Sequence, residues 1–210
     1  MYSFNETDLK GAYVIDNFSV GDNRGRFTKC YVKEIYEEAG INFNLSETFL
    51  SSSAKNVIRG IHFQRNNPQA KLVSVPKGKV YDVIVDLRVD SPTFRQWRGF
   101  ELSEENARSL YIPKGFGHGF LSLEDNTLML YQCDGKYDKE TDSGIMYDDK
   151  DIGIIWPISK EDEIHSERDL SLESLKEYML CPMGTYWYYN YIMGNTVRKW
   201  SEIWRCLFLK

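Results

Sequence analysis

The chain has 210 residues, a net charge of −5 and four cysteines. This length can bury a sizeable core without disulfides or metals, and the acidic balance excludes the basic surface that nucleic acid requires. The cysteines form no CxxC pair, which excludes a zinc knuckle or a disulfide framework and is typical of a reducing compartment. The polar N-terminus lacks the apolar core of a signal peptide, and no apolar run is as long as a membrane span. We therefore expect a cytoplasmic protein with no membrane span.

Strand-like segments dominate the chain from residue 12 to residue 156. In chain order they are residues 12–20, 56–64, 71–89, 96–115, 118–133 and 154–157. Gly, Pro, Asn or Asp recur about every ten residues between them, which is typical of an all-β sandwich or barrel. A short helix is predicted at residues 33–41, with Gly40 as its C-cap. Long helices do not alternate with the strands, so a parallel α/β sheet is not expected.

The segment VYDVIVDLRV, residues 80–89, alternates along its length. Val83 and Val85 fall on one face of the predicted strand, and Asp82, Ile84 and Asp86 fall on the other. This pattern predicts a strand whose two faces meet different surroundings.

The pattern changes after Asp169. LSLESLKEYM predicts a short helix at residues 170–179. Apolar side chains then recur at helical spacing within residues 195–210, namely Val197, Trp200, Ile203, Trp204, Leu207 and Phe208. We predict a main domain of residues 1–175 and a helical C-terminal extension of residues 176–210. We favour an extension that packs on the main domain or on a partner subunit; a membrane-surface helix and a poorly ordered tail are the alternatives.

The histidines raise the question of a metal site. PKGFGH, ending at His118, has the P-x-G-x-x-H form of the second cupin motif. A metal-binding cupin also has H-x-H in its first motif, where this chain reads His62-Phe63-Gln64. An amide is a poor ligand for a transition metal, so we predict no metal.

The surroundings of His62 are ambiguous from the residues alone. Strand alternation puts His62 and Arg59 on opposite faces, unless a bulge at Gly60 re-aims Arg59. Lys71 opens the next strand nine residues later and is expected near His62. A buried ammonium needs a partner, which an anionic or carbonyl-bearing ligand would supply. Taken alone, His62 is equally explained as a half-buried structural histidine, and Tyr131 as a core residue.

Several segments together resemble a known family. VIRGIHFQ, QAKLVSVPKGKVYDVIVDLRVDSPTF, YIPKGFGHGF, YQCDGKYD and DIGIIWP…SERD are similar, in order and spacing, to the dTDP-4-dehydrorhamnose 3,5-epimerases over residues 10–175. The resemblance implies a metal-free, cofactor-free cupin jelly roll with short peripheral helices, a homodimer, and a nucleotide sugar bound at the barrel mouth. It also implies a reaction for deoxysugar and surface-polysaccharide synthesis. A C4 ketone acidifies the C3 and C5 protons, a base removes one, and a proton returns to the opposite face of the enolate.

The resemblance assigns a role to each matching residue. The proton-transfer set is His62 as base, Asp169 as its carboxylate partner, Lys71 beside the enolate oxygen and Tyr131 as opposite-face donor. The expected substrate-binding residues are Arg24, Phe27, Lys29, Glu47, Phe49, Arg59, His118, Tyr137 and Asp142. Within this set, Arg59 is expected to contact the diphosphate. The Tyr137 ring is expected to stack on the base of the nucleotide. Arg24 and Phe27 are expected to reach the nucleotide from the partner subunit.

Two departures affect the expected recognition of the nucleotide. The family pattern has Glu where this chain has Lys29, and Q-x-N where it has Glu47-Thr48-Phe49. A cationic Lys29 cannot accept the N3–H of thymine, and Phe49 replaces an amide with apolar bulk. The nucleotide is therefore open between dTDP, GDP and CDP, and heptoses are open as the sugar. The alternative functions are epimerisation at C3 or C5 alone, carbonyl migration by a ketoisomerase, and sugar binding without catalysis.

Overall fold

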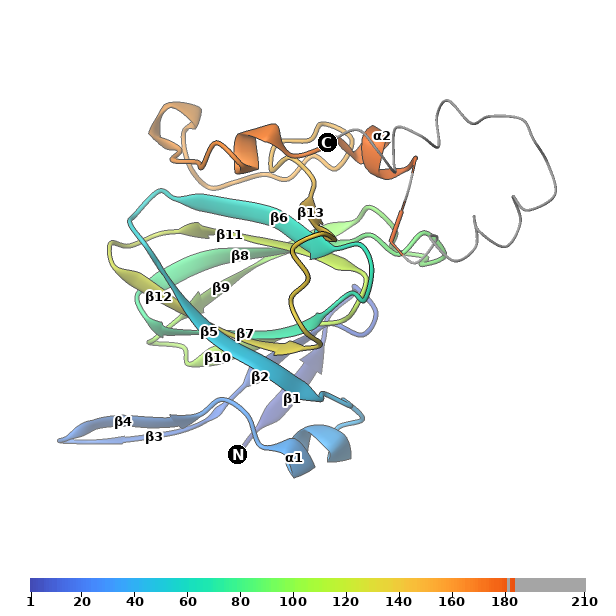
Figure 1. Ribbon diagram of the computed structural model, residues 1–210. Coiled ribbons are helices and arrows are strands. Elements are labelled where there is room, and N and C mark those ends of the chain that lie inside the picture. The colour runs from blue at the N-terminus through green and yellow to red at the C-terminus, as the bar shows by residue number, and fades with distance from the viewer. Residues whose placement is uncertain (181, 184–210) are drawn as a thin grey trace.

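The computed structural model describes residues 1–180 and 182–183 (Figure 1). The strands, in chain order, are β1 (Ser3–Glu6), β2 (Tyr13–Asp16), β3 (Phe18–Asp22), β4 (Gly25–Lys29), β5 (Leu45–Ser53), β6 (Ile58–Gln64), β7 (Ala70–Lys77), β8 (Lys79–Asp86), β9 (Trp97–Ser103), β10 (Arg108–Ile112), β11 (Phe116–Ser122), β12 (Thr127–Asp134) and β13 (Asp142–Gly144). The helical elements are α1 (Lys33–Glu38), the 3₁₀ turns η1 (Lys160–Asp162) and η2 (Asp169–Ser171), and α2 (Leu175–Tyr178). The predicted helix at 33–41 is confirmed as α1, and Gly40 follows it with a φ of +80°, as a C-terminal glycine should.

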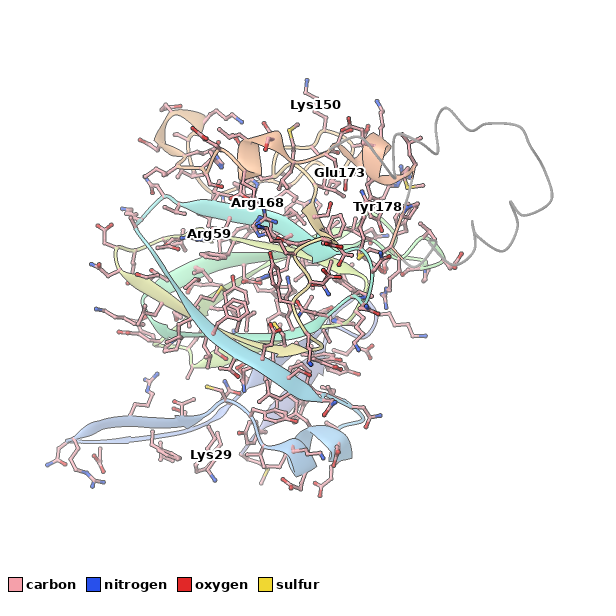
Figure 2. All side chains as sticks on the ribbon, viewed as in Figure 1. Lys29, Arg59, Lys150, Arg168, Glu173 and Tyr178 are labelled. Carbon is pink, nitrogen blue, oxygen red and sulfur yellow. The ribbon has the colours of Figure 1, made fainter. Side chains whose placement is uncertain are left out.

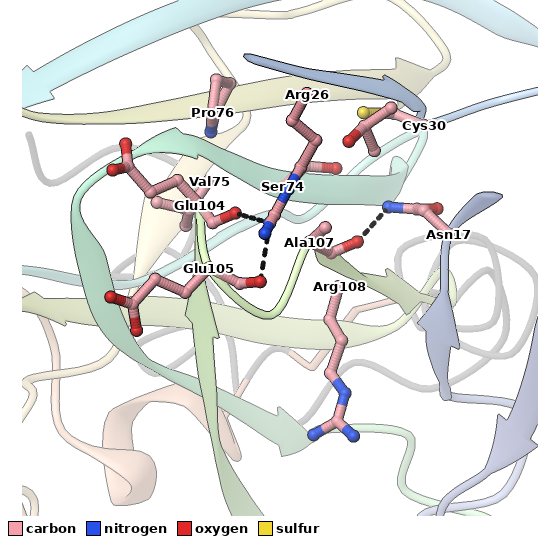
Figure 3. Close-up of a pocket in the computed structure, with 11 residues that line it drawn as sticks. Asn17, Arg26, Cys30, Ser74, Val75, Pro76, Glu104, Glu105, Ala107 and Arg108 are labelled. Atoms are coloured by element: carbon pink, nitrogen blue, oxygen red, sulfur yellow. Dashed lines mark hydrogen bonds between the residues drawn. The ribbon is translucent and has the colours of Figure 1, made fainter. Parts of the chain in front are cut away.

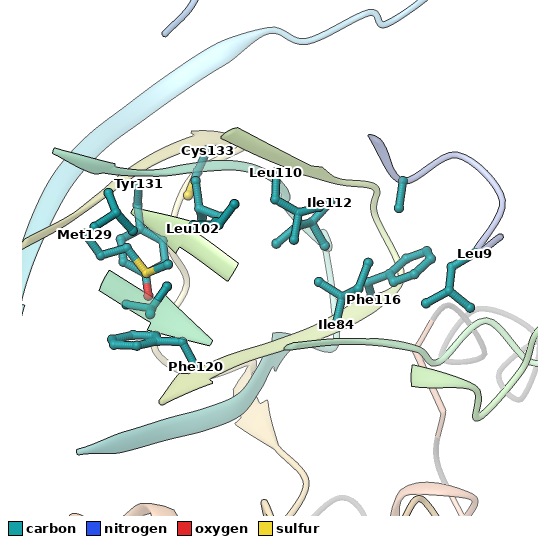
Figure 4. Packing of buried hydrophobic residues seen from close by; sticks show 14 residues of the cluster. Leu9, Ile84, Leu102, Leu110, Ile112, Phe116, Phe120, Met129, Tyr131 and Cys133 are labelled. Carbon is teal, nitrogen blue, oxygen red and sulfur yellow. The ribbon is translucent and has the colours of Figure 1, made fainter. Parts of the chain in front are cut away.

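Two antiparallel sheets face each other and form the barrel (Figure 1). One is six-stranded, in the order β1-β2-β10-β7-β12-β5, and the other is five-stranded, in the order β13-β6-β11-β8-β9. Apolar side chains from both sheets meet between them, as Figure 4 shows for Leu110 of the six-stranded sheet and Ile84 and Phe120 of the five-stranded sheet. This packing removes the inner faces of both sheets from water, which drives formation of the barrel.

The outer face of the five-stranded sheet is buried as well. Val83 and Val85 lie in a second cluster with Trp156 and Tyr178, whereas Ile84 lies inside the barrel, so the predicted alternation is confirmed. Residues 154–157 are not the predicted strand. Ile154 and Trp156 pack on this outer face, whereas Ile155 is 74% exposed, and the Trp156 indole donates to the carbonyl of Tyr147 at 3.0 Å.

The C-terminal end of the described chain is part of this packing. The helix predicted at 170–179 is confirmed in shorter form as α2, and the Tyr178 hydroxyl donates to the carbonyl of Leu87 at 2.8 Å. The division after residue 175 stays a prediction, and the helix predicted within 195–210 lies outside the described residues. Among the described helices, none has the length and apolar character needed to cross a membrane.

A hairpin of β3 and β4 projects from the body of the molecule (Figure 1). The predicted strand 12–20 breaks at Asn17, whose amide donates to the Ser109 hydroxyl at 2.7 Å and so separates β2 from β3. At the hairpin's base, the Arg26 guanidinium donates to the carbonyls of Glu104 and Glu105 beside a cavity of about 430 Å³ (Figure 3). These bonds fix the direction in which the hairpin leaves the barrel.

Candidate active site

A bulge in β6 determines which way Arg59 points. Strand β11 pairs His118 with His62 and Phe120 with Arg59, so the one residue between them on β11 opposes two residues of β6, Gly60 and Ile61. His118 and Phe120 share a face of their strand, and their partners therefore share it too. Plain alternation therefore does not hold here, and the exception that the sequence analysis allowed, a bulge at Gly60, is present. The bulge at Gly60, where an added Cβ would lie 2.5 Å from the Gly119 backbone, turns both side chains to the barrel side.

The imidazole of His62 is held by an acid from a distant loop. His62 Nε2 lies 2.6 Å from Asp169 Oδ1, and Asp169 is placed by turn η2. Since a carboxylate accepts, Nε2 carries the proton and Nδ1 is the free base. Burial lowers the pKa of His62, although Asp169 opposes that shift. The imidazole is therefore neutral, and able to accept a proton, at ordinary pH.

Lys71, at the start of β7, lies beside His62 as expected. Its ammonium is 3.5 Å from the His62 carbonyl oxygen. Burial lowers the pKa of Lys71, while the carboxylates of Asp142 and Asp82 favour its charged form. The pocket thus holds a desolvated cation whose interaction with a ligand anion would be weakly screened.

His118 forms a second histidine–aspartate pair that the sequence did not reveal. Its Nε2 lies 2.9 Å from Asp82 Oδ2, and both side chains are buried inside the barrel. Burial raises the pKa of the Asp82 carboxyl, and His118 opposes that shift. Strand alternation had placed Asp82 on one face of β8, but no local pattern indicates its partner on β11.

Tyr131 lies on the facing sheet, in β12. Its ring meets the His118 imidazole edge-on at a centroid distance of 5.7 Å and stacks on Phe49 of β5 at 4.8 Å. Burial raises the pKa of the Tyr131 hydroxyl far above its ordinary value, so it is a proton donor at neutral pH.

Arg59 is anchored at the barrel mouth. Its Nε donates to the Ser53 hydroxyl at 3.1 Å and its Nη2 to the Ser52 carbonyl at 3.2 Å. These contacts hold the guanidinium beside β5, a placement that the sequence analysis did not anticipate.

A polar network joins the loop after β12 to the turn that carries Asp169. One carboxylate oxygen of Asp142 accepts from the Tyr137 hydroxyl at 3.0 Å and from Arg168 Nη2 at 2.7 Å. Glu47 accepts from the Tyr137 backbone N–H. The structure therefore brings these three predicted binding residues together. Arg168, next to Asp169 in sequence, was missed because a loop arginine is ordinarily solvated.

Gln64 occupies the position of the second imidazole of a metal-binding cupin. Its amide nitrogen donates to the carbonyls of Asn67 and Lys136, and its oxygen accepts from the Asp138 N–H at 2.8 Å. The side chain is thus engaged in holding the loop after β12. Within residues 1–180 and 182–183, no group of three or more His, Cys, Asp or Glu side chains is arranged to hold a metal ion.

The remaining predicted binding residues lie elsewhere. Arg24, Phe27 and Lys29 belong to the β3–β4 hairpin, and Lys29 lies well away from Arg59 in Figure 2. Arg24 pairs with Asp22 near the hairpin tip, and Phe27 is 55% exposed. Within one chain, the structure does not bring these three residues to His62.

Comparison with known proteins places this arrangement in a family. Residues 6–177 match the family described as dTDP-4-dehydrorhamnose 3,5-epimerase. The enzyme of that name from Methanothermobacter thermautotrophicus is 44% identical over 177 residues, which cover 84% of this chain and 96% of the relative. The chain belongs to the dTDP-4-dehydrorhamnose 3,5-epimerase family. The predicted family and the predicted class of enzyme, an isomerase, are confirmed.

Solved structures agree with this membership. The Legionella pneumophila dTDP-6-deoxy-D-glucose-3,5-epimerase, in complex with dTDP-4-keto-L-rhamnose, is 38% identical, with a TM-score of 0.81 over 84% of this chain and 94% of that one. A 3'-monoepimerase from Streptomyces bikiniensis, in complex with dTDP-quinovose, is 29% identical, with a TM-score of 0.79 over 90% of this chain and 98% of that one. The all-β cupin jelly roll is thereby confirmed.

Proposed function

We propose that this protein epimerises C3 and C5 of a nucleotide-linked 4-keto-6-deoxy sugar, by proton removal and return through an enolate. One observation carries the proposal: a free imidazole base and a protonated phenol lie on facing sheets of one barrel. His62 is on β6 and Tyr131 is on β12, in the other sheet. His118 links the two, because it is the register partner of His62 and its imidazole contacts the Tyr131 ring. Such an arrangement can take a proton from one face of a sugar ring and return one to the other.

The first step is proton removal. His62 Nδ1 takes the proton from the carbon next to the C4 ketone, and the C–H electron pair forms the enolate. The Asp169 carboxylate, 2.6 Å from Nε2, holds the ring and stabilises the imidazolium that results.

The enolate oxygen needs a positive neighbour. Lys71 is the candidate, because its ammonium is close to the His62 carbonyl oxygen and inside the barrel. In a site of low polarity, a fixed cation beside a developing oxyanion lowers the barrier by about several kcal/mol.

Proton return completes the inversion. The Tyr131 hydroxyl gives its proton to the opposite face of the carbon. The phenolate then recovers a proton from solvent, and the His62 imidazolium releases its proton to solvent. The high pKa of Tyr131 keeps it protonated until the strongly basic enolate forms. Repetition at the second carbon gives the doubly inverted sugar with no net oxidation.

Substrate binding draws on two subunits. In this proposal Arg59 binds the diphosphate, and the Tyr137 ring stacks on the base of the nucleotide. A homodimer in the cytoplasm would bring Arg24 and Phe27 of the projecting hairpin to the neighbouring barrel. In support, these hairpin side chains are exposed and point to no site of their own chain. Sedimentation analysis tests the dimer; a monomer at all concentrations would reject it.

The reaction itself is tested in deuterated water. A dTDP-, GDP- or CDP-linked 4-keto-6-deoxy sugar is incubated with the protein, and the C3 and C5 proton signals are followed by NMR. Loss of both signals supports the 3,5-epimerase. Loss of one signal supports the second candidate, a single epimerisation, which the similarity to the Streptomyces 3'-monoepimerase favours. Binding without exchange would reject both.

The choice of nucleotide is tested by calorimetry with dTDP, GDP and CDP. The ligand of the Legionella relative favours dTDP. Lys29 favours a different base, because its ammonium cannot accept the N3–H of thymine. A clear preference for dTDP would reject the altered specificity predicted from the sequence.

A further inference from the structure

Phe49 is an apolar side chain in an unusual place. It lies on β5, the edge strand of the six-stranded sheet, directly opposite Tyr131 in the register of β12. Its ring is 47% exposed, so it is not part of the barrel core. It nevertheless lies parallel to the Tyr131 ring, with 10° between the planes and 4.8 Å between the centroids.

Two rings that contact Tyr131, those of His118 and Phe49, differ in their exposure to solvent. On one side is the His118 imidazole, which the buried Asp82 holds in place. On the other side is Phe49, next to solvent. The Tyr131 ring thus contacts the buried His118–Asp82 pair and, next to solvent, Phe49, in addition to its neighbours in the barrel core.

We propose that Phe49 is a positioning residue for Tyr131: it holds the phenol ring at the angle from which its proton reaches the far face of the enolate. This inference rests on the proposed function. Phe49 itself does not touch the reacting carbon in this mechanism, and it acts through Tyr131. A smaller or non-aromatic side chain would let the Tyr131 ring turn toward the space that Phe49 vacates.

The test uses the fate of the enolate. An enolate that receives deuterium from His62 returns as labelled substrate with retained configuration, while one that receives deuterium from Tyr131 becomes inverted product. NMR in deuterated water gives the ratio of inverted to retained label. Because both come from one enolate, the ratio does not depend on how much protein is folded or how fast the enolate forms.

Phe49→Leu should lower this ratio by about two- to tenfold, the range that one aromatic stack accounts for. Phe49→Tyr, which keeps the ring, should restore the ratio. Leu50→Ala is the matched control, because Leu50 is an exposed residue of the same strand that points to the opposite face, and it should leave the ratio unchanged.

A Phe49→Leu variant with the wild-type ratio would overturn the inference, and so would one whose only defect is a higher KM, since that would make Phe49 a substrate contact. In a Tyr131→Phe background, Phe49→Leu should have no further effect on the ratio; an added loss would equally overturn it. Failure of the proposed function is seen separately, because the wild type itself would then take up no label.

Discussion

The barrel contains two histidine–aspartate pairs that are alike in chemistry and opposite in surroundings. His62 and His118 face each other across β6 and β11, and each directs Nε2 at a carboxylate. The His62 and Asp169 side chains are 25% and 5% exposed, whereas those of His118 and Asp82 are 3% and 0% exposed.

The two pairs have the same residue types, so their difference in solvent exposure is what separates a histidine that can act as a base from one with a structural role. Asp82 comes from β8, which has a neighbouring strand on each side, so its pair with His118 is almost fully buried inside the barrel. Asp169 comes from a turn beyond the last strand, so its pair forms at the mouth, where a substrate can reach the imidazole. We therefore expect substitutions in the open pair to change the reaction, and substitutions in the closed pair to change stability and, through the contact of His118 with Tyr131, the return of the proton.

The largest effect is expected from His62→Asn. Without the base, exchange of the sugar protons into deuterated water should fall by about 10²–10⁴-fold. Thermal unfolding should change little, because His62 lies at the mouth. NMR measures the exchange, and a variant that still exchanges at the wild-type rate would remove His62 as the base.

Asp82→Ala should act on stability. It leaves the His118 Nε2 buried without its partner and removes one carboxylate near Lys71. We expect the free energy of unfolding to fall by about 1–3 kcal/mol, the cost of leaving a buried hydrogen-bonding group without its partner. Urea titration followed by circular dichroism measures it. An unchanged urea midpoint would show that the His118–Asp82 pair does not stabilise the fold.

Asp169→Asn should weaken the reaction less and shift its pH dependence. A hydrogen bond to a charged group contributes about 1.5–3 kcal/mol, so kcat should fall about 10- to 100-fold. Asp169 raises the pKa of His62, and its loss lowers that pKa further. The acid limb of kcat/KM should therefore move to lower pH. A limb that moves to higher pH would contradict the pairing.

The smallest effect is expected at the third histidine, His165. It also pairs with a carboxylate, Glu163, at 3.1 Å, but in the segment that covers the outer face of the five-stranded sheet. His165→Gln should leave proton exchange unchanged and lower the free energy of unfolding by about 1 kcal/mol. It serves as the matched control for His62→Asn. A large loss of exchange would mean that the outer segment sets the position of Asp169.

The positions of many strands along the chain, and the two faces of β8, were predictable, because alternation and turn residues mark strands in a sequence. Val83, Ile84 and Val85 fell on the faces that alternation gave them. The failures have physical causes. Residues 154–157 were read as a strand because they are apolar, but a cover that packs on a sheet is just as apolar. The face of Arg59 could not be decided from alternation, because a single bulge at Gly60 reverses the side-chain face beyond it.

The site was harder to predict than the fold. His62 and Asp169 are far apart in the chain, and only the family resemblance linked them. Asp82 and His118 meet across two neighbouring strands, and their register depends on the whole sheet. Neither the stack of Phe49 on Tyr131 nor the contact of Arg168 with Asp142 has a local signature, because each forms between segments that the barrel brings together.

The hydrogen bonds of Gln64 carry a lesson for protein design. To an engineer, this position invites conversion to the H-x-H pattern of a metal-binding cupin. Yet Gln64 holds the loop after β12 through both ends of its amide, and an imidazole at that position could not reproduce those three bonds. The same loop carries Tyr137. A metal ligand at this position would thus remove the hydrogen bonds that hold the loop of Tyr137, on which the nucleotide base is proposed to stack. Metal binding and nucleotide binding therefore make opposite demands on this one side chain.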